Sequence, residues 1–197
     1  RLTAADVTNA WFTMPGSLSQ WYNTCSYNKL NFYNDKNLVF GPIDIPCSGV
    51  GFDFEQRCDN NDMYKLWNQA EAWINQNQPR VNVGSYKRRI MLVYGLPLCP
   101  WAGLGSVGCA WGTCFSWMKI GAERVVPLYT TVHELGHNIG LQHSTRMYSD
   151  SVQGEYEDNT CPMGSGGAGT GLVTCFNAVQ SYKAGWMQPL EFRFPDM

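Results

Sequence analysis

The sequence predicts an α+β domain, because helical and strand periods both occur along a single chain of 197 residues. Between residues 61 and 77, apolar side chains recur every three or four positions, which is the period of an α-helix. Between residues 109 and 118, large and small side chains alternate instead, which is the period of a β-strand. The length suits one domain with enough chain to bury a core.

The first elements in chain order are a short helix and a strand. Residues 17–27 are predicted to form the helix, with Ser17 or Ser19 as its N-cap. Residues 37–45 are predicted to form the strand, which ends before Pro46 because proline cannot donate a hydrogen bond to a sheet.

The helix over residues 61–77 comes next and is the clearest early element. Asp59 or Asn60 can cap its start, and Pro79 stops the chain soon after its end. Its apolar stripe indicates a core face rather than a ligand site. The stripe consists of Met63, Leu66, Trp67, Ala70 and Ile74.

Two strands and two helices follow. Residues 89–94 are an apolar run of strand length, and residues 109–118 are the alternating strand. Residues 129–139 are predicted as a second long helix and residues 175–183 as the final one. The polar and acidic residues 144–160 are predicted to be a surface loop, since they lack the spacing of an EF-hand calcium site.

Composition argues against two classes of partner. Fourteen Lys and Arg against sixteen Asp and Glu give a net charge of −2, so the chain lacks the basic surplus of a nucleic-acid-binding protein. The same balance gives no electrostatic reason to bind an anionic membrane. Residues 90–118 carry no charge, but the glycines, prolines and cysteines among them disfavour a spanning helix. We therefore expect no membrane insertion.

The eight cysteines include no CxxC pair, which zinc sites built from four cysteines usually contain. Four disulfides, and hence an oxidising compartment outside the cell, are therefore predicted, with eight reduced thiols as the alternative. If the protein is secreted, a leader, with or without a pro-segment, is expected to have been removed before Arg1. The cysteines are Cys25, Cys47, Cys58, Cys99, Cys109, Cys114, Cys161 and Cys175.

All three histidines of the chain lie in the pattern H-E-x-x-H-x-x-G-x-x-H. A helix turns about 100° per residue, so His133 and His137 are about 40° apart on one face and can bind one ion. His143 would point away if the helix continued. The helix must therefore break, and Gly140 can take the left-handed turn that brings His143 back as third ligand.

This ligand set predicts a hydrolytic zinc site. Three neutral imidazoles suit Zn²⁺ and leave a fourth position for water, whose pKa the ion lowers to about 7. Glu134 follows the first ligand and can take the proton of that water, then deliver it to the leaving amine.

Two other interpretations stay open. A disulfide-rich module could hold zinc without catalysis and bind glycoproteins through its tryptophans, although Glu134 argues against this. A copper or other metal centre could use the same ligands, because Cu²⁺ outranks Zn²⁺ in affinity for such donors.

With these motifs the sequence resembles the metzincin metallopeptidases, and within them the gametolysin family, peptidase family M11. The likeness is close over residues 126–186, about a third of the chain. The N-terminal half agrees only in its general order of elements. The segments that carry the resemblance are residues 133–144, 154–158, 161–164, 176–178 and 185–186.

The resemblance implies a secreted, two-lobed zinc endopeptidase in a single catalytic domain. Residues 1–139 would form an N-terminal lobe with a twisted mixed sheet and helices, and residues 140–197 a smaller, irregular C-terminal lobe. The active-site cleft would lie between them. Met163 would form a tight structural turn beneath the metal without binding it.

The resemblance also implies a substrate class, the hydroxyproline-rich glycoproteins of cell walls. Such a protein substrate would bind extended along an edge strand, for which residues 109–118 are the candidate. Some metzincins place a tyrosine two positions after the turn methionine, but Ser165 stands there. Tyr148, Tyr156 and Tyr182 are then the candidates for that role. The enzyme is expected to be a monomer.

Overall fold

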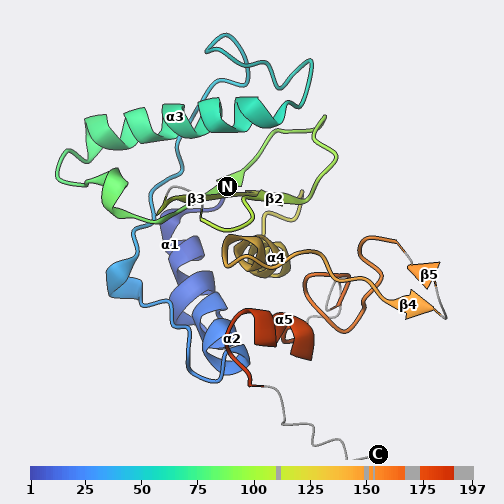
Figure 1. The fold of residues 1–197 in the computed structure, drawn as a ribbon. Helices are drawn as coiled ribbons and strands as arrows, with labels where there is room; N and C mark the ends of the chain where they lie inside the picture. The colour runs from blue at the N-terminus through green and yellow to red at the C-terminus, as the bar shows by residue number, and fades with distance from the viewer. Residues whose placement is uncertain (110–111, 149–150, 153, 167–173, 189–197) are drawn as a thin grey trace, which may run out of the picture.

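A small mixed β-sheet lies between two long helices, α3 and α4 (Figure 1). The structure is a computed structural model, and it describes residues 1–109, 112–148, 151–152, 154–166 and 174–188. Strands β1 (Arg88–Val93) and β3 (Cys114–Lys119) run parallel, and β2 (Gly103–Gly105) pairs antiparallel with β3, which gives the order β1-β3-β2. The predicted α+β class is confirmed.

Helix α3 (Asn60–Asn77) covers one face of the sheet. Its predicted apolar stripe is buried, because the large side chains of β3 point toward it. The ring of Tyr64 meets those of Phe115 and Trp117 edge-on, at centroid distances of 5.2 and 5.1 Å. The apolar stripe predicted from the helical period therefore forms the core together with the large side chains of β3.

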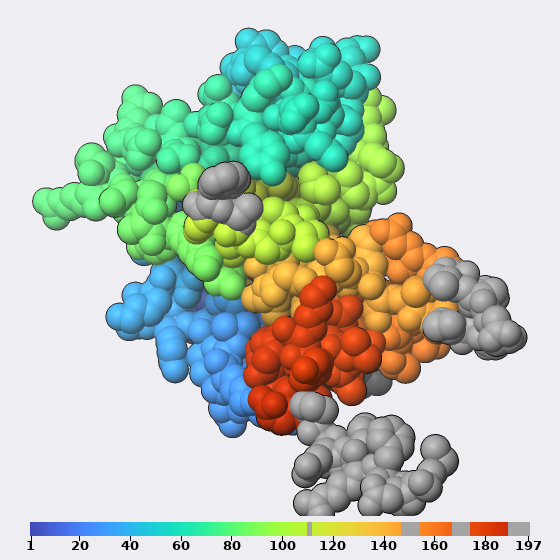
Figure 2. Space-filling model, viewed as in Figure 1, coloured from blue at the N-terminus to red at the C-terminus, as the bar shows by residue number. Residues whose placement is uncertain are grey.

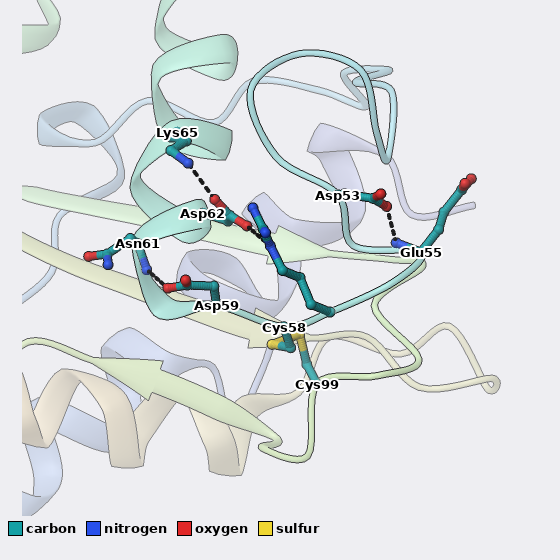
Figure 3. Close-up of polar contacts among 9 residues, drawn as sticks. Asp53, Glu55, Cys58, Asp59, Asn61, Asp62, Lys65 and Cys99 are labelled. Carbon is teal, nitrogen blue, oxygen red and sulfur yellow. Dashed lines mark hydrogen bonds and ion pairs between the residues drawn. A yellow bond between two sulfur atoms is a disulfide. The ribbon is translucent and has the colours of Figure 1, made fainter.

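The start of α3 is fixed by polar contacts and by a disulfide (Figure 3). Asp59 is the N-cap, and its side chain accepts a hydrogen bond of 2.8 Å from Asn61 N. The buried carboxylate of Asp62 binds Lys65 at 2.6 Å and Arg57 at 3.2 Å. The disulfide between Cys58 and Cys99 connects this end of α3 to the loop after β1.

Helix α4 (Leu128–Asn138) lies against the opposite face of the sheet, where β3 presents the small side chains of Cys114 and Ser116. Ser116 Oγ donates to Asn138 Oδ1 at 3.1 Å, and Asn138 Nδ2 donates to Ser106 O, also at 3.1 Å. The predicted alternation of β3 thus has a structural reason. Its large residues meet α3, and its small residues let α4 approach.

The remaining elements are short and surround this core. Helix α2 follows the predicted Ser17 cap, whose side chain accepts from Gln20 N at 3.3 Å. On the face shown in Figure 2, the segment around α5 packs between the segment around α2 and the segment after α4. The elements are α1 (Ala4–Thr8), η1 (Asn9–Thr13), α2 (Leu18–Cys25), η2 (Asn34–Lys36), η3 (Val83–Ser85), β4 (Met147–Tyr148), β5 (Ser151–Val152) and α5 (Ala178–Lys183).

Two strand predictions need correction. Residues 37–45 form no strand, because Pro42 interrupts them without an N–H to donate, and their apolar side chains pack on the core as irregular chain. Of the described residues in the range 109–118, only those from Cys114 onward join the sheet, and the disulfide from Cys109 ends at the first residue of this strand. Residues 110–111 of that prediction lie outside the described residues.

The prediction of four disulfides is also wrong in number. The structure contains three, Cys25–Cys175, Cys58–Cys99 and Cys109–Cys114. The other two cysteines stay free because their environments differ: Cys161 is buried in the core, whereas Cys47 is exposed. Within the described part of the chain, no helix combines the length and the apolar character that crossing a membrane requires.

Candidate metal centre

Helix α4 carries two of the three histidines on one face, and the chain turns back to deliver the third. The rings of His133 and His137 lie 4.9 Å apart. Gly140 takes a φ of +92°, and its N–H donates to His137 O at 2.8 Å, which ends the helix. His143 then reaches the same side, with its ring 4.7 Å from that of His137.

The three imidazoles converge on one point. A ligand nitrogen from each of His133, His137 and His143 lies within 4.8 Å of the others. The Nε2 atoms of His137 and His143 are 3.0 Å apart. These residues could therefore hold one metal ion.

The other ring nitrogen of each histidine has an acceptor. His133 Nδ1 lies 2.7 Å from Pro162 O, and His137 Nδ1 lies 2.9 Å from Leu141 O. Because a carbonyl oxygen only accepts, each Nδ1 carries the proton and each Nε2 keeps its lone pair for a metal. His143 Nδ1 meets the carboxylate of Glu155 in the same way.

Burial keeps the helix histidines neutral. It lowers the pKa of His133 to about 4, with the neighbouring histidines adding a smaller effect in the same direction. Burial also lowers the pKa of His137. Neutral imidazole is the form that binds a metal, so both ligands are ready at physiological pH.

Met163 lies in a tight turn below α4. The turn is closed by Gly164 N, which donates to Cys161 O at 2.9 Å. Met163 is fully buried, and its sulfur packs so closely against Gly136 that a Cβ there would overlap it. Tyr129 Oη donates to Gly164 O at 2.9 Å and so connects the turn to the helix. The turn thus supports the helix between the two histidine positions.

Glu134 is buried against the edge of the sheet. It is 5% exposed, and its carboxylate fills the space that side chains on Gly103 and Gly105 would need. Burial raises the pKa of Glu134 to about 8, although a cation bound nearby would oppose that rise. The group is therefore poised to exchange a proton near neutral pH.

The predicted substrate edge, residues 109–118, is wrong, because β3 is the central strand. Among the described strands, the edge next to Glu134 belongs to β2, which pairs only with β3. Residues on either side of β2 bond to β3, with Lys119 N donating to Ala102 O and Ser106 N donating to Phe115 O. By the alternation of an antiparallel ladder, the backbone groups of Gly103 and Gly105 face the other way. They point outward, beside the buried carboxylate.

Of the three candidate tyrosines, Tyr156 lies beside the histidines. Its ring is 4.2 Å from that of His143 and 6.0 Å from that of His133. Partial burial, with the nearby Glu155 and Glu134, raises its pKa, so it keeps its hydroxyl proton. Tyr182 is exposed on α5, and the side chain of Tyr148 lies outside the described residues.

Sequence reasoning named Tyr156 as one of three candidate tyrosines but missed the contact between Glu155 and His143. It treated residues 144–160 as a surface loop, yet Glu155 and Tyr156 both contact His143. The available signal was an acidic and an aromatic residue between the last histidine and the turn methionine. That signal is too common to stand alone.

Three histidines around one point, with a buried carboxylate beside them, define a site of the metallopeptidase type. The model of the family described as Gametolysin peptidase M11 matches residues 1–193, so the chain belongs to this family of metallopeptidases. The chain is similar to the protein named autolysin from Chlamydomonas reinhardtii, at 28% identity over 221 aligned residues that include 88% of the chain. The chain spans 34% of the length of that relative. No solved structure matches the chain.

Proposed function

We propose that this chain is the catalytic domain of a secreted zinc-dependent endopeptidase. The observation that carries the proposal is the convergence of His133, His137 and His143 on one point, with the buried Glu134 directly after His133 on α4. Three neutral nitrogen donors fit Zn²⁺ and leave a coordination position for water or substrate. A site closed by four protein ligands would indicate a structural metal instead.

The residues divide the reaction between them. Zn²⁺, when bound, supplies a Lewis acid that makes water acidic and polarises the scissile carbonyl. Glu134 takes the proton of the attacking water and returns it to the leaving amine. The hydroxyl of Tyr156 donates a hydrogen bond to the carbonyl oxygen, on which negative charge develops in the transition state. Met163 supports the helix that bears two of the ligands.

The substrate would bind as an added strand along β2. The outward backbone groups of Gly103 and Gly105 can pair with an extended peptide, and this places its backbone beside Glu134. In the metzincin-like arrangement that we propose, the cleft separates an N-terminal lobe, residues 1–139, from a C-terminal lobe, residues 140–197. The enzyme would act as a monomer on single extended segments.

As the natural substrate we propose an extracellular wall glycoprotein rich in proline or hydroxyproline, the class that the resemblance to the gametolysin family implies. The three disulfides support secretion, because such bonds persist in oxidising compartments. A net charge of −2 supports neither a nucleic acid nor an anionic membrane as partner.

Digestion assays test this function. The protein should cleave casein or gelatin, lose that activity to a chelator, and regain it with Zn²⁺. Elemental analysis of the protein as isolated should find zinc rather than copper. Mapping cleavage sites in a peptide library, beside a proline-rich wall glycoprotein, identifies the substrate class. Zinc-loaded protein that cleaves none of these would instead support a non-catalytic module that binds metal or glycoprotein.

A further inference from the structure

His143 differs from the other two histidines in how the fold holds it. His133 and His137 lie on a regular helix, whereas His143 lies on irregular chain after the turn at Gly140. For His133 and His137, the acceptor of the Nδ1 hydrogen bond is a main-chain carbonyl, which no side-chain substitution removes. The acceptor for His143 Nδ1 is the side chain of Glu155.

We propose that Glu155 is the positioning residue of the metal centre, which holds the His143 imidazole so that Nε2 faces the metal. The inference rests on the proposed function only in its assumption that the three histidines bind Zn²⁺. A carboxylate that accepts from Nδ1–H fixes the tautomer and the ring orientation, and it makes Nε2 a stronger donor.

The loop around Glu155 is held at both ends. At its start, Gly154 O accepts a hydrogen bond of 2.5 Å from Thr145 Oγ1. At its end, Asp158 accepts from Ser144 Oγ and from Asn177 Nδ2, both at 2.8 Å. These anchors place the loop over the third ligand, because Ser144 and Thr145 directly follow His143 in the chain.

A second contact from the same loop orients the imidazole. The ring of Tyr156 lies 4.2 Å from that of His143 at an interplanar angle of 45°. Glu155 therefore fixes one edge of the imidazole while Tyr156 covers its face. With both contacts, the ring has little freedom to turn Nε2 away from the site.

Glu157 offers a matched control in the same loop. It is an exposed carboxylate, two residues from Glu155, and its Oε2 lies 3.4 Å from Arg146 Nη2. The side chains of Glu155 and Glu157 are 66% and 41% exposed. Substitutions at the two positions change the charge of the loop equally, and only one of them removes the contact with His143.

The experiment measures Zn²⁺ affinity by competition with a chromophoric chelator, and the absorption spectrum of the Co²⁺-loaded protein. Glu155→Ala should weaken Zn²⁺ binding about 10- to 100-fold and shift the Co²⁺ bands, which is the usual effect of losing such a partner. Glu155→Gln keeps a carbonyl acceptor and should recover part of the loss. Glu157→Ala should match the wild type in both readouts.

Two results would overturn the inference. In the first, Glu155→Ala binds Zn²⁺ with the affinity of the wild type and keeps the wild-type Co²⁺ spectrum. In the second, Glu157→Ala loses as much Zn²⁺ affinity as Glu155→Ala. The thermal midpoint of each metal-free variant shows whether it folds. If Glu155→Ala does not fold, Glu155→Gln is compared with the wild type and Glu157→Ala instead. These readouts need no peptidase activity. A wild type that binds zinc but cleaves nothing removes only the proposed function, and one that binds no zinc removes both.

Discussion

The carboxylate of Glu134 packs directly on the backbone of Gly103, so closely that a Cβ on this glycine would overlap Oε1. The proposed general base and the free edge of the sheet are therefore in contact. We therefore expect a peptide that pairs with this edge to run beside the carboxylate.

Glu134→Gln should slow cleavage by orders of magnitude while leaving the metal in place. The amide keeps the shape of the side chain but cannot take a proton, so we expect kcat to fall by about 10²- to 10⁴-fold. Zinc content, measured on the purified variant, should equal that of the wild type. Unchanged cleavage would remove the proposed mechanism.

Gly103→Ala should impair catalysis by displacing Glu134. The added methyl group needs space that Oε1 now fills, and a misplacement of about 1 Å can cost roughly 100-fold in rate. We expect kcat/KM to fall at least about tenfold with the zinc content retained. Gly84→Ala is the control, because its Cβ would meet only the end of the Asn82 side chain. Equal activity in both variants would contradict the close packing.

The stability of the metal-free protein should fall between pH 6.5 and pH 8. Burial raises the pKa of Glu134 to about 8, so the folded state holds a proton that the unfolded state has released. Folding is then favoured at low pH, and this contribution is lost as pH rises through the folded-state pKa. Below pH 6.5 the lowered pKa of His133 acts in the opposite sense, because the unfolded chain binds more protons there.

The measurement is the free energy of unfolding by urea at several pH values, in the presence of chelator. Glu134→Gln lacks the titrating group, so it should gain stability relative to the wild type across this window. A constant difference between the two proteins from pH 6.5 to pH 8 would show that Glu134 is already ionised at pH 6.5.

Tyr156→Phe should lower kcat more than it changes KM. The hydroxyl is proposed to bind charge that exists only in the transition state, so its loss should cost about tenfold or more in kcat. Zinc affinity should change little, because the ring that covers His143 remains. Tyr182→Phe, on the exposed face of α5, should behave as the wild type. A rise in KM alone would assign Tyr156 to substrate binding.

The disulfide pattern predicts two titratable thiols. It also predicts that the Cys25–Cys175 bridge strongly stabilises the folded protein. Thiol titration of the unfolded, unreduced protein should find only Cys47 and Cys161. Replacing Cys25 and Cys175 together by alanine should lower the free energy of unfolding by about 2–4 kcal/mol. Cys47→Ala should leave it unchanged, since this side chain is exposed and unpaired. If no thiol were found, Cys47 and Cys161 would instead form a fourth bridge.

Local periodicity carried the parts of the fold that sequence could predict. The stripe from Met63 to Ile74 and the alternation of β3 are each visible in consecutive residues. The break after His137 followed from geometry, because one ion cannot be reached by three histidines on a straight helix. Family likeness added Met163, whose burial beneath Gly136 no local pattern indicates.

The parts that sequence could not predict depend on contacts between distant segments. Residues 37–45 look like a strand, but no strand among the described residues pairs with them, and pairing is not a local property. The identity of the edge strand depends on which neighbour β3 takes, and β2 is too short to show a period. Glu155 meets His143 only because Asp158 and its partners fold the loop back.

The bridge between Cys25 and Cys175 encloses most of the chain, including the metal centre, in one covalent ring. A single nick in any loop within that ring, whether by a neighbouring molecule or by another protease, would leave both pieces joined. In a protein exposed to proteases, such a ring would keep the fragments together after a single cut. The cut would become visible as two bands only after reduction.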